Sequence, residues 1–278
     1  MGLAEWFGYL VQFIFFGIWA HPHGFVVYVL FLTLAGWSAW GFAKRSGAAE
    51  QLSRISVAER NGIAFGAAVL AALMAAAQVL PLVIESESGL AVTQRLIASA
   101  AFPLGAALGV VTFAWVMMND NARRGAWLDA LTLPLLAWLG VAALGAYLAG
   151  LEVMHVGRAT RMPWGVNFGD GVYRHPVQLY EMLGLFAISR LTRCLSAVRR
   201  DRLPVVPGDV FRLTWLCVLA LTVVLGFFKP PFQRPRLLTE VLRGEPLAYF
   251  GTLTAMQAVA LLLLFLLLPA WWRLLKGL

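Results

Sequence analysis

The chain has 278 residues, of which 60% are hydrophobic and 13% are charged, and its formal net charge is +8. A soluble domain usually has about 25% charged residues, so this composition excludes an ordinary water-soluble protein. The basic excess comes without the fold or the aromatic interleaving of a nucleic-acid binder, so we exclude nucleic acid as a partner and expect a membrane instead.

The apolar residues gather into runs that are long enough to cross a membrane. Residues 1–20 have no basic start and no small-residue cleavage site, so we expect an interfacial helix there and no removable signal peptide. A membrane-spanning helix needs roughly 20 apolar residues, and the runs of that length are 24–43, 61–84, 96–118, 130–151 and 246–272. Weaker candidates at about 176–195 and at 213–228 complete the set. The sequence therefore predicts an all-α, polytopic integral membrane protein with about seven transmembrane helices, in a single transmembrane domain, 1–278.

The positions of Lys and Arg predict the orientation of these spans. Cytoplasmic loops retain an excess of positive charge, and with seven spans most of the 22 Lys and Arg residues fall on one side. We therefore expect the N-terminus outside and the C-terminus in the cytoplasm. Nearly all the outer cations lie in two loops, 152–175 and 229–245.

These two outer loops depart from the positive-inside rule. One interpretation is that they are solvated basic loops. The other is that they bind a substrate with an anionic group, because Arg presents a planar fork of donors that matches phosphate. A phospholipid headgroup fits both the charge and the depth of such a site.

The first of these loops leads into a helix that carries polar residues into the membrane. The Gly-Asp-Gly sequence at 169–171 predicts a tight turn. We expect the helix to begin at Pro176 with His175 as its cap, because Pro lacks the donor that the first position leaves unused. His175, Gln178 and Glu181 then follow at spacings of three and project from one side of the helix.

Glu181 is a candidate site residue in its own right. A carboxyl group inside a span is costly and normally faces a protein interior or a wet cavity. The alternative is a structural role, in which Glu181 pairs with a basic residue such as Arg174 or Arg158. Pairing and function can coexist.

The same loop and helix carry the most specific pattern in the chain. Residues 174–181 read Arg-His-Pro-Val-Gln-Leu-Tyr-Glu, and Gly-Arg-Ala-Thr, Met-Pro-Trp-Gly-Val and Phe-Gly-Asp-Gly precede them at 157–160, 162–166 and 168–171. This pattern resembles the phosphatidylglycerol–prolipoprotein diacylglyceryl transferases and their close paralogues. Weaker similarity at 23–40, 145–150, 227–229 and 254–257 extends the resemblance over most of the chain.

The resemblance implies a multi-pass protein of the bacterial inner membrane with a periplasm-facing site. The implied reaction moves diacylglycerol from phosphatidylglycerol, or another anionic phospholipid, to the thiol of a prolipoprotein cysteine and releases glycerol phosphate. No metal and no cofactor are implied, since typical family members need none and the four His residues show no ligand spacing.

The chemistry and the resemblance together nominate a set of site residues. Attack by the thiolate requires a base and cations that stabilise the departing phosphate. His175 or His155 can serve as the base. The expected catalytic residues are His175, Gln178 and Glu181, and the expected substrate-binding residues are Arg158, Arg174, Lys229, Tyr180 and Asp170.

Several family positions are replaced in this chain. An arginine that precedes the glycine-rich stretch of the family is Ala143 here, and the asparagine or cysteine that follows its first glycine is Ala146. The His-Gly-Gly loop reads Phe-Pro-Leu-Gly-Ala-Ala at 102–107, and the Arg-Glu-Pro-Asp element reads Lys-Pro-Pro-Phe at 229–232. The resemblance is therefore to a divergent paralogue, whose catalytic competence these replacements bring into question.

The sequence alone is compatible with three functions. The first is transfer of a lipid-derived group from phosphatidylglycerol to a protein or another acceptor. The second is a lipid-binding or accessory membrane protein that kept the headgroup cleft and lost the reaction. The third is a transporter or scramblase, which the lack of a polar path through the inner halves of the spans disfavours.

Overall fold

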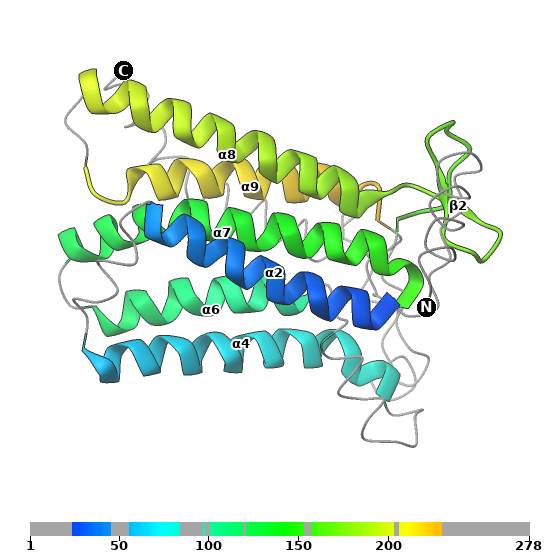
Figure 1. Cartoon of the computed structure of the whole chain (residues 1–278), viewed down its shortest axis with the longest axis horizontal. Helices are drawn as coiled ribbons and strands as arrows, with labels where there is room; N and C mark the ends of the chain where they lie inside the picture. Colours follow the sequence, from blue (N-terminus) through cyan, green and yellow to red (C-terminus); the bar gives the residue numbers. More distant parts are fainter. Residues whose placement is uncertain are drawn as a thin grey trace, which may run out of the picture.

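The computed structural model describes residues 24–45, 56–83, 97, 101–118, 121–152, 157–202 and 206–229. These residues are mostly helical, in the order α2 (Gly24–Arg45), α4 (Val57–Val83), α6 (Ala101–Met117), α7 (Asn121–Ala149), the 3-10 helix η1 (Gly150–Glu152), β1 (Val166–Asn167), β2 (Tyr173–Arg174), α8 (Val177–Arg202) and α9 (Asp209–Gly226). The long helices lie side by side, and the two short strands lie beyond one end of them (Figure 1).

Each predicted span that the described residues cover overlaps one of these helices. Among the described residues, four helices are long and apolar enough to cross a membrane: Gly24–Arg45, Val57–Ala76, Arg123–Ala149 and Asp209–Gly226. Residues Phe102–Phe113 form a shorter apolar helix. These apolar helices support a multi-pass membrane protein. The predicted span at 246–272 and the predicted interfacial helix at 1–20 lie outside the described residues.

Small residues bring the helices together in two close pairs. A side chain at Gly24 of α2 would overlap the backbone of Ala149 at the end of α7. In the same way, a side chain at Gly109 of α6 would overlap the backbone of Ala67 in α4. Close backbone approach of this kind is how helices associate in a membrane, where lipid tails are as apolar as the side chains. The pairs α2–α7 and α4–α6 are therefore the tight units of the bundle.

The core lies around α7, which packs against α2, α6, α8 and α9. Its buried apolar residues include Trp127, Leu128 and Leu135, and they form one cluster with Leu185 of α8 and Val218 of α9. A buried hydrogen bond of 2.9 Å between the hydroxyls of Thr192 and Thr214 also joins α8 to α9. These contacts hold α7, which precedes the hairpin, against α8 and α9, which follow it.

Basic residues gather at the end of the bundle away from the hairpin. That end contains the end of α2, the starts of α4, α7 and α9, and the end of α8 (Figure 1). The cations at these helix ends include Lys44, Arg45, Arg60, Arg123, Arg124 and Arg212.

At this basic end, α7 caps the start of α9. The two carboxylate oxygens of Asp129 accept hydrogen bonds of 2.8 Å from the backbone N–H groups of Gly208 and Phe211. These donors have no partner within α9, and the positive end of the helix dipole favours a carboxylate there. Gly208 has a φ of 95°, which favours glycine at this turn. Asp129 therefore fixes the entry of α9 against α7.

We predict that Asp129→Ala destabilises the protein by about 1–2 kcal/mol, the usual cost of losing a helix cap. Glu59→Ala is the matched control, because Glu59 caps the exposed start of α4 through a reciprocal pair of bonds with Ser56. We expect a smaller loss there, since water replaces the lost partner. Melting temperatures in mild detergent measure both, and equal losses would contradict a special role for Asp129.

Candidate functional site

A hairpin beyond the end of α7 shapes the loop that the sequence singled out. β1 and β2 pair antiparallel, with Val166 opposite Arg174 and Asn167 opposite Tyr173. The side-chain oxygen of Asn167 accepts bonds of 2.9 and 3.1 Å from the N–H groups at 169 and 171. Both glycines have positive φ, 97° and 78°. The tight turn predicted at 169–171 is thus confirmed, and the side chain of Asn167 stabilises it.

Three segments that are distant in sequence meet beside this hairpin. The N–H of His175 donates to the carbonyl of Arg158 at 3.0 Å, and the N–H of Thr160 donates to the carbonyl of Tyr173 at 2.8 Å. The N–H of Arg158 in turn donates to the carbonyl of Phe228 at 2.8 Å, just after α9. The loop before β1, the start of α8 and the end of α9 are therefore held together by backbone bonds.

Helix α8 begins one residue later than predicted. Its first residue is Val177, and the carbonyl of Pro176 accepts bonds from the N–H groups of Leu179 and Tyr180 at 3.0 and 3.1 Å. Pro176 is therefore the residue at the boundary and not the first residue of the helix, and His175 lies outside it. The physical argument about Pro still applies, because its missing donor is not needed at the boundary.

Aromatic rings surround the imidazole of His175. Its ring centroid lies 5.0 Å from that of Phe228 and 6.2 Å from that of Tyr180, and the Phe228 and Tyr180 rings are 5.9 Å apart. His175 Nδ1 lies 3.4 Å from the Tyr180 hydroxyl. Sequence reasoning missed Phe228 as part of this group, although the Phe-Phe-Lys sequence at 227–229 was a matching signal.

The three residues of the predicted polar stripe have different environments. Gln178 is fully buried, with an exposed fraction of 0%, and within the described part of the chain neither the oxygen nor the nitrogen of its amide has a hydrogen-bond partner. The Nε of Arg174 is likewise buried without a partner. His175 and Glu181 are only partly buried. A buried polar group without a partner typically costs about 1–3 kcal/mol, so Gln178 differs from Thr192 of the same helix, whose hydroxyl has partners.

The charged side chains near the stripe form two ion pairs. Lys229 Nζ lies 3.9 Å from Glu181 Oε2, and Arg174 lies 2.6 Å from Asp170. Glu181 thus pairs with a basic residue, as the structural alternative expects, and that partner is Lys229, while Arg174 pairs with Asp170 in the hairpin. Arg158 is exposed. Three cations and two carboxylates leave one positive charge in excess for an anionic ligand.

The pKa of Asp170 reports the strength of the pair in the hairpin. Partial burial favours the neutral acid, but the guanidinium of Arg174 and the N–H of Val172 outweigh burial and hold the pKa of Asp170 below its ordinary value. The carboxylate is therefore charged at neutral pH. Its stabilising effect is complete above the pKa of the unfolded chain, about 3.9, and is lost as the pH falls through the lower folded value.

The replaced positions on α7 lie in packed surroundings. Ala143 and Ala146 are both buried, and Ala146 belongs to an apolar cluster with Tyr28 and Leu32 of α2. His155 and the rest of the second outer loop, from 230 onward, lie outside the described residues. The predicted catalytic and substrate-binding residues lie at one end of the bundle, and they are Asp170, Arg158, Arg174, His175, Gln178, Tyr180, Glu181 and Lys229.

The hairpin should depend more on Asn167 than on the surface ion pair. We predict that Asn167→Ala increases amide hydrogen exchange at 168–174 severalfold, because two backbone donors lose a buried acceptor. Asp170→Asn should change it less, since an exposed pair contributes less than about 1 kcal/mol. In the unmodified protein the contribution of Asp170 should persist at neutral pH and fade below about pH 4. The opposite order of the two variants would refute this account.

Three curated proteins are similar to part of this chain, and each is named phosphatidylglycerol–prolipoprotein diacylglyceryl transferase. The protein of Tolumonas auensis is 30% identical over 134 residues, which are 46% of this chain and 48% of that relative. The protein of a Wolbachia of Brugia malayi is 33% identical over 105 residues, 35% of this chain and 38% of that relative. The protein of Cupriavidus necator is 36% identical over 108 residues, 34% of this chain and 38% of that relative.

The chain thus spans between 38% and 48% of the length of these curated relatives. No protein-family model matches the chain, and no solved structure matches it. Three relatives at 30–36% identity that share one name support a divergent member of the prolipoprotein diacylglyceryl transferase family.

Proposed function

We propose that this protein transfers a diacylglyceryl group from phosphatidylglycerol to an acceptor thiol, in the manner that the names of its relatives indicate. The acceptor of our proposal is a prolipoprotein cysteine. A sulfur–carbon bond forms at the glycerol carbon, the bond from that carbon to the phosphate oxygen breaks, and glycerol phosphate leaves. The proton of the thiol passes to a base. The observation that carries the proposal is the buried amide of Gln178, unpaired within the described residues, on the same helix as Glu181, the partner of Lys229.

Each nominated side chain has a role in this proposal. His175 is the base, because a neutral imidazole nitrogen can accept a proton and the rings of Phe228 and Tyr180 lie against it. Arg158 and Lys229 neutralise the phosphate, and Glu181 positions Lys229 through their ion pair.

Two further roles concern the shape of the site. Arg174 directs its buried Nε toward a ligand oxygen while its pair with Asp170 fixes the hairpin. Gln178 donates its amide hydrogens to the substrate. Tyr180 contacts the headgroup next to His175.

We further propose that the whole chain, 1–278, is one transmembrane domain of seven spans in the bacterial inner membrane. The N-terminus lies outside, the C-terminus lies in the cytoplasm, and the loops at 152–175 and 229–245 face outward. The separation of charge supports this orientation, because the basic helix ends lie away from the hairpin (Figure 1).

The orientation predicts a labelling pattern. A cysteine placed at Gly171, whose surroundings are open, should react with a membrane-impermeant thiol reagent in intact cells. A cysteine in place of Arg60 at the start of α4 should react only after the cells are opened. The two native cysteines, Cys194 and Cys217, are first replaced by Ser to remove background. Reversed labelling would overturn the proposed orientation.

A substitution at Gln178 tests whether its amide binds the substrate or only contributes to the structure. We predict that Gln178→Leu lowers the rate of diacylglyceryl transfer about 10²-fold, the typical effect of losing one donor to a developing charge. The melting temperature should stay the same or rise, because the apolar side chain removes an unpaired amide from the interior. Transfer is measured in phosphatidylglycerol vesicles by the mass gain of a peptide with a lipobox cysteine.

Thr192→Val is the matched control, since it also replaces a buried polar side chain of α8. Its hydroxyl has partners at Ile188 and Thr214, so the melting temperature should fall while transfer continues. A Gln178→Leu protein that transfers at the unmodified rate would contradict the proposed role of the amide.

A second candidate function is a lipid-binding accessory protein. The burial of Ala143 and Ala146 and the apolar cluster around Ala146 favour it, because the resemblance places polar family residues at both positions. An unmodified protein that binds phosphatidylglycerol but fails to transfer its diacylglyceryl group, and fails to complement a transferase-depleted strain, would support this function and exclude transfer.

A further inference from the structure

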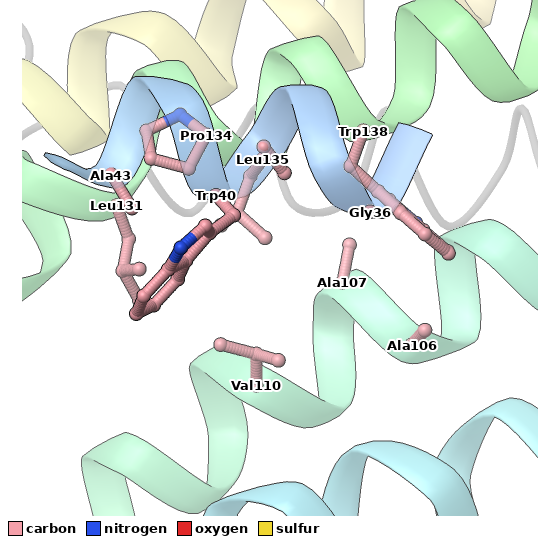
Figure 2. A pocket seen from close by; sticks show the side chains of 11 residues that line it. Gly36, Trp40, Ala43, Ala106, Ala107, Val110, Leu131, Pro134, Leu135 and Trp138 are labelled. Carbon is pink, nitrogen blue, oxygen red and sulfur yellow. The ribbon is translucent and has the colours of Figure 1, made fainter. Parts of the chain in front are cut away.

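A cavity of about 340 Å³ lies between α2, α6 and α7, and it is open rather than enclosed. Its volume falls in the range of about 300–1,000 Å³ that is usual for small-molecule sites. All of its lining residues are apolar. Figure 2 shows Trp40 and Trp138 toward opposite sides of the lining, with Ala107 between them. None of the nominated residues of the candidate site lines this cavity.

The cavity follows from how the helices pair. The close pairs α2–α7 and α4–α6 leave a looser seam where α6 faces α2 and α7. Trp138 Nε1 donates to the carbonyl of Pro103 at 3.0 Å and bridges this seam on one side. Gly36, Ala106 and Ala107 are too small to fill it. An unfilled void forfeits van der Waals contacts along its whole lining, so an occupant that completes the packing is favoured.

A positive charge stands at the rim of this apolar space. Lys44 Nζ lies 5.6 Å from the centroid of the Trp40 ring, and Trp40 lines the cavity. Arg45 follows at the end of α2, and both cations are exposed. Tryptophan and lysine at the end of an apolar helix mark the level of the lipid headgroups. The cavity thus extends from the headgroup level into the apolar part of the bundle.

We propose that this cavity binds an anionic phospholipid, with an acyl chain between α2, α6 and α7 and its phosphate at Lys44 and Arg45. The acyl chain gains little hydrophobic energy, because surrounding lipid is as apolar as the cavity. Its contribution is close packing, whereas the charge at the rim selects the headgroup. This site lies toward the basic end of the bundle, opposite the hairpin, and it is independent of the proposed transfer reaction.

The test counts lipids on the detergent-purified protein by native mass spectrometry. The two probes are phosphatidylglycerol and phosphatidylcholine with the same acyl chains. We expect the protein to retain phosphatidylglycerol in preference to phosphatidylcholine at this site. Lys44→Gln should weaken the affinity for phosphatidylglycerol about fivefold, which corresponds to about 1 kcal/mol. Lys44→Arg keeps the charge and should keep the affinity. Arg60→Gln, which removes a cation from the same end but from α4, should also leave it unchanged.

Larger side chains in the cavity test whether an acyl chain binds there. Ala106→Phe and, as a second variant, Ala39→Leu enlarge residues of the lining that are partly exposed. Each should reduce the number of retained phosphatidylglycerol molecules by one, whereas Leu34→Phe on an exposed face of α2 should not. Melting temperatures identify any variant that fails to fold.

Lys229→Gln separates this site from the candidate site. Lys44→Gln and Ala106→Phe should reduce the retention of phosphatidylglycerol by the same amount with and without Lys229→Gln. This result is expected whether or not the transferase proposal holds. Equal retention of the two lipids, or full retention of phosphatidylglycerol in both cavity-filling variants, would overturn the inference.

Discussion

The geometry of the candidate site depends on one backbone hydrogen bond, from the N–H of Arg158 to the carbonyl of Phe228 at 2.8 Å. Arg158 also accepts a bond from the N–H of His175, so one residue joins the end of α9 to the start of α8. The side chains that approach each other, such as Lys229 and Glu181, come from these two separate helices. A shift of either helix end would therefore separate the cation from the carboxylate.

Within this frame, the polar groups of the start of α8 are not satisfied equally. Among the residues that the structure describes, the buried amide of Gln178 has no partner, while Thr192 in the same helix has partners for its hydroxyl. Natural sequences satisfy buried polar groups almost everywhere, and exceptions tend to coincide with functional sites. The contrast between these two residues supports the proposed site at the hairpin end of α8.

The sequence predicted the helices well because runs of about 20 apolar residues have few alternatives in a membrane. The turn at 169–171 was also predictable, since glycines with positive φ follow from the local sequence. The ion pair of Lys229 with Glu181 was not, because it joins residues that meet only in the folded chain. The cap of α9 by Asp129 and the burial of Gln178 were missed for the same reason.

The two alanines on α7 connect packing to the divergence of the chain. Ala146 packs against Tyr28 and Leu32, and a side chain on the neighbouring Gly145 would overlap Phe31 of α2. A long cation or an amide on this face would have to displace α2, whose close contact with α7 is one of the two tight units of the bundle. If the resemblance is right about the polar family residues on α7, their replacement and the tight approach of α2 are linked, and the polar groups of the proposed site then come from the hairpin, α8 and the end of α9.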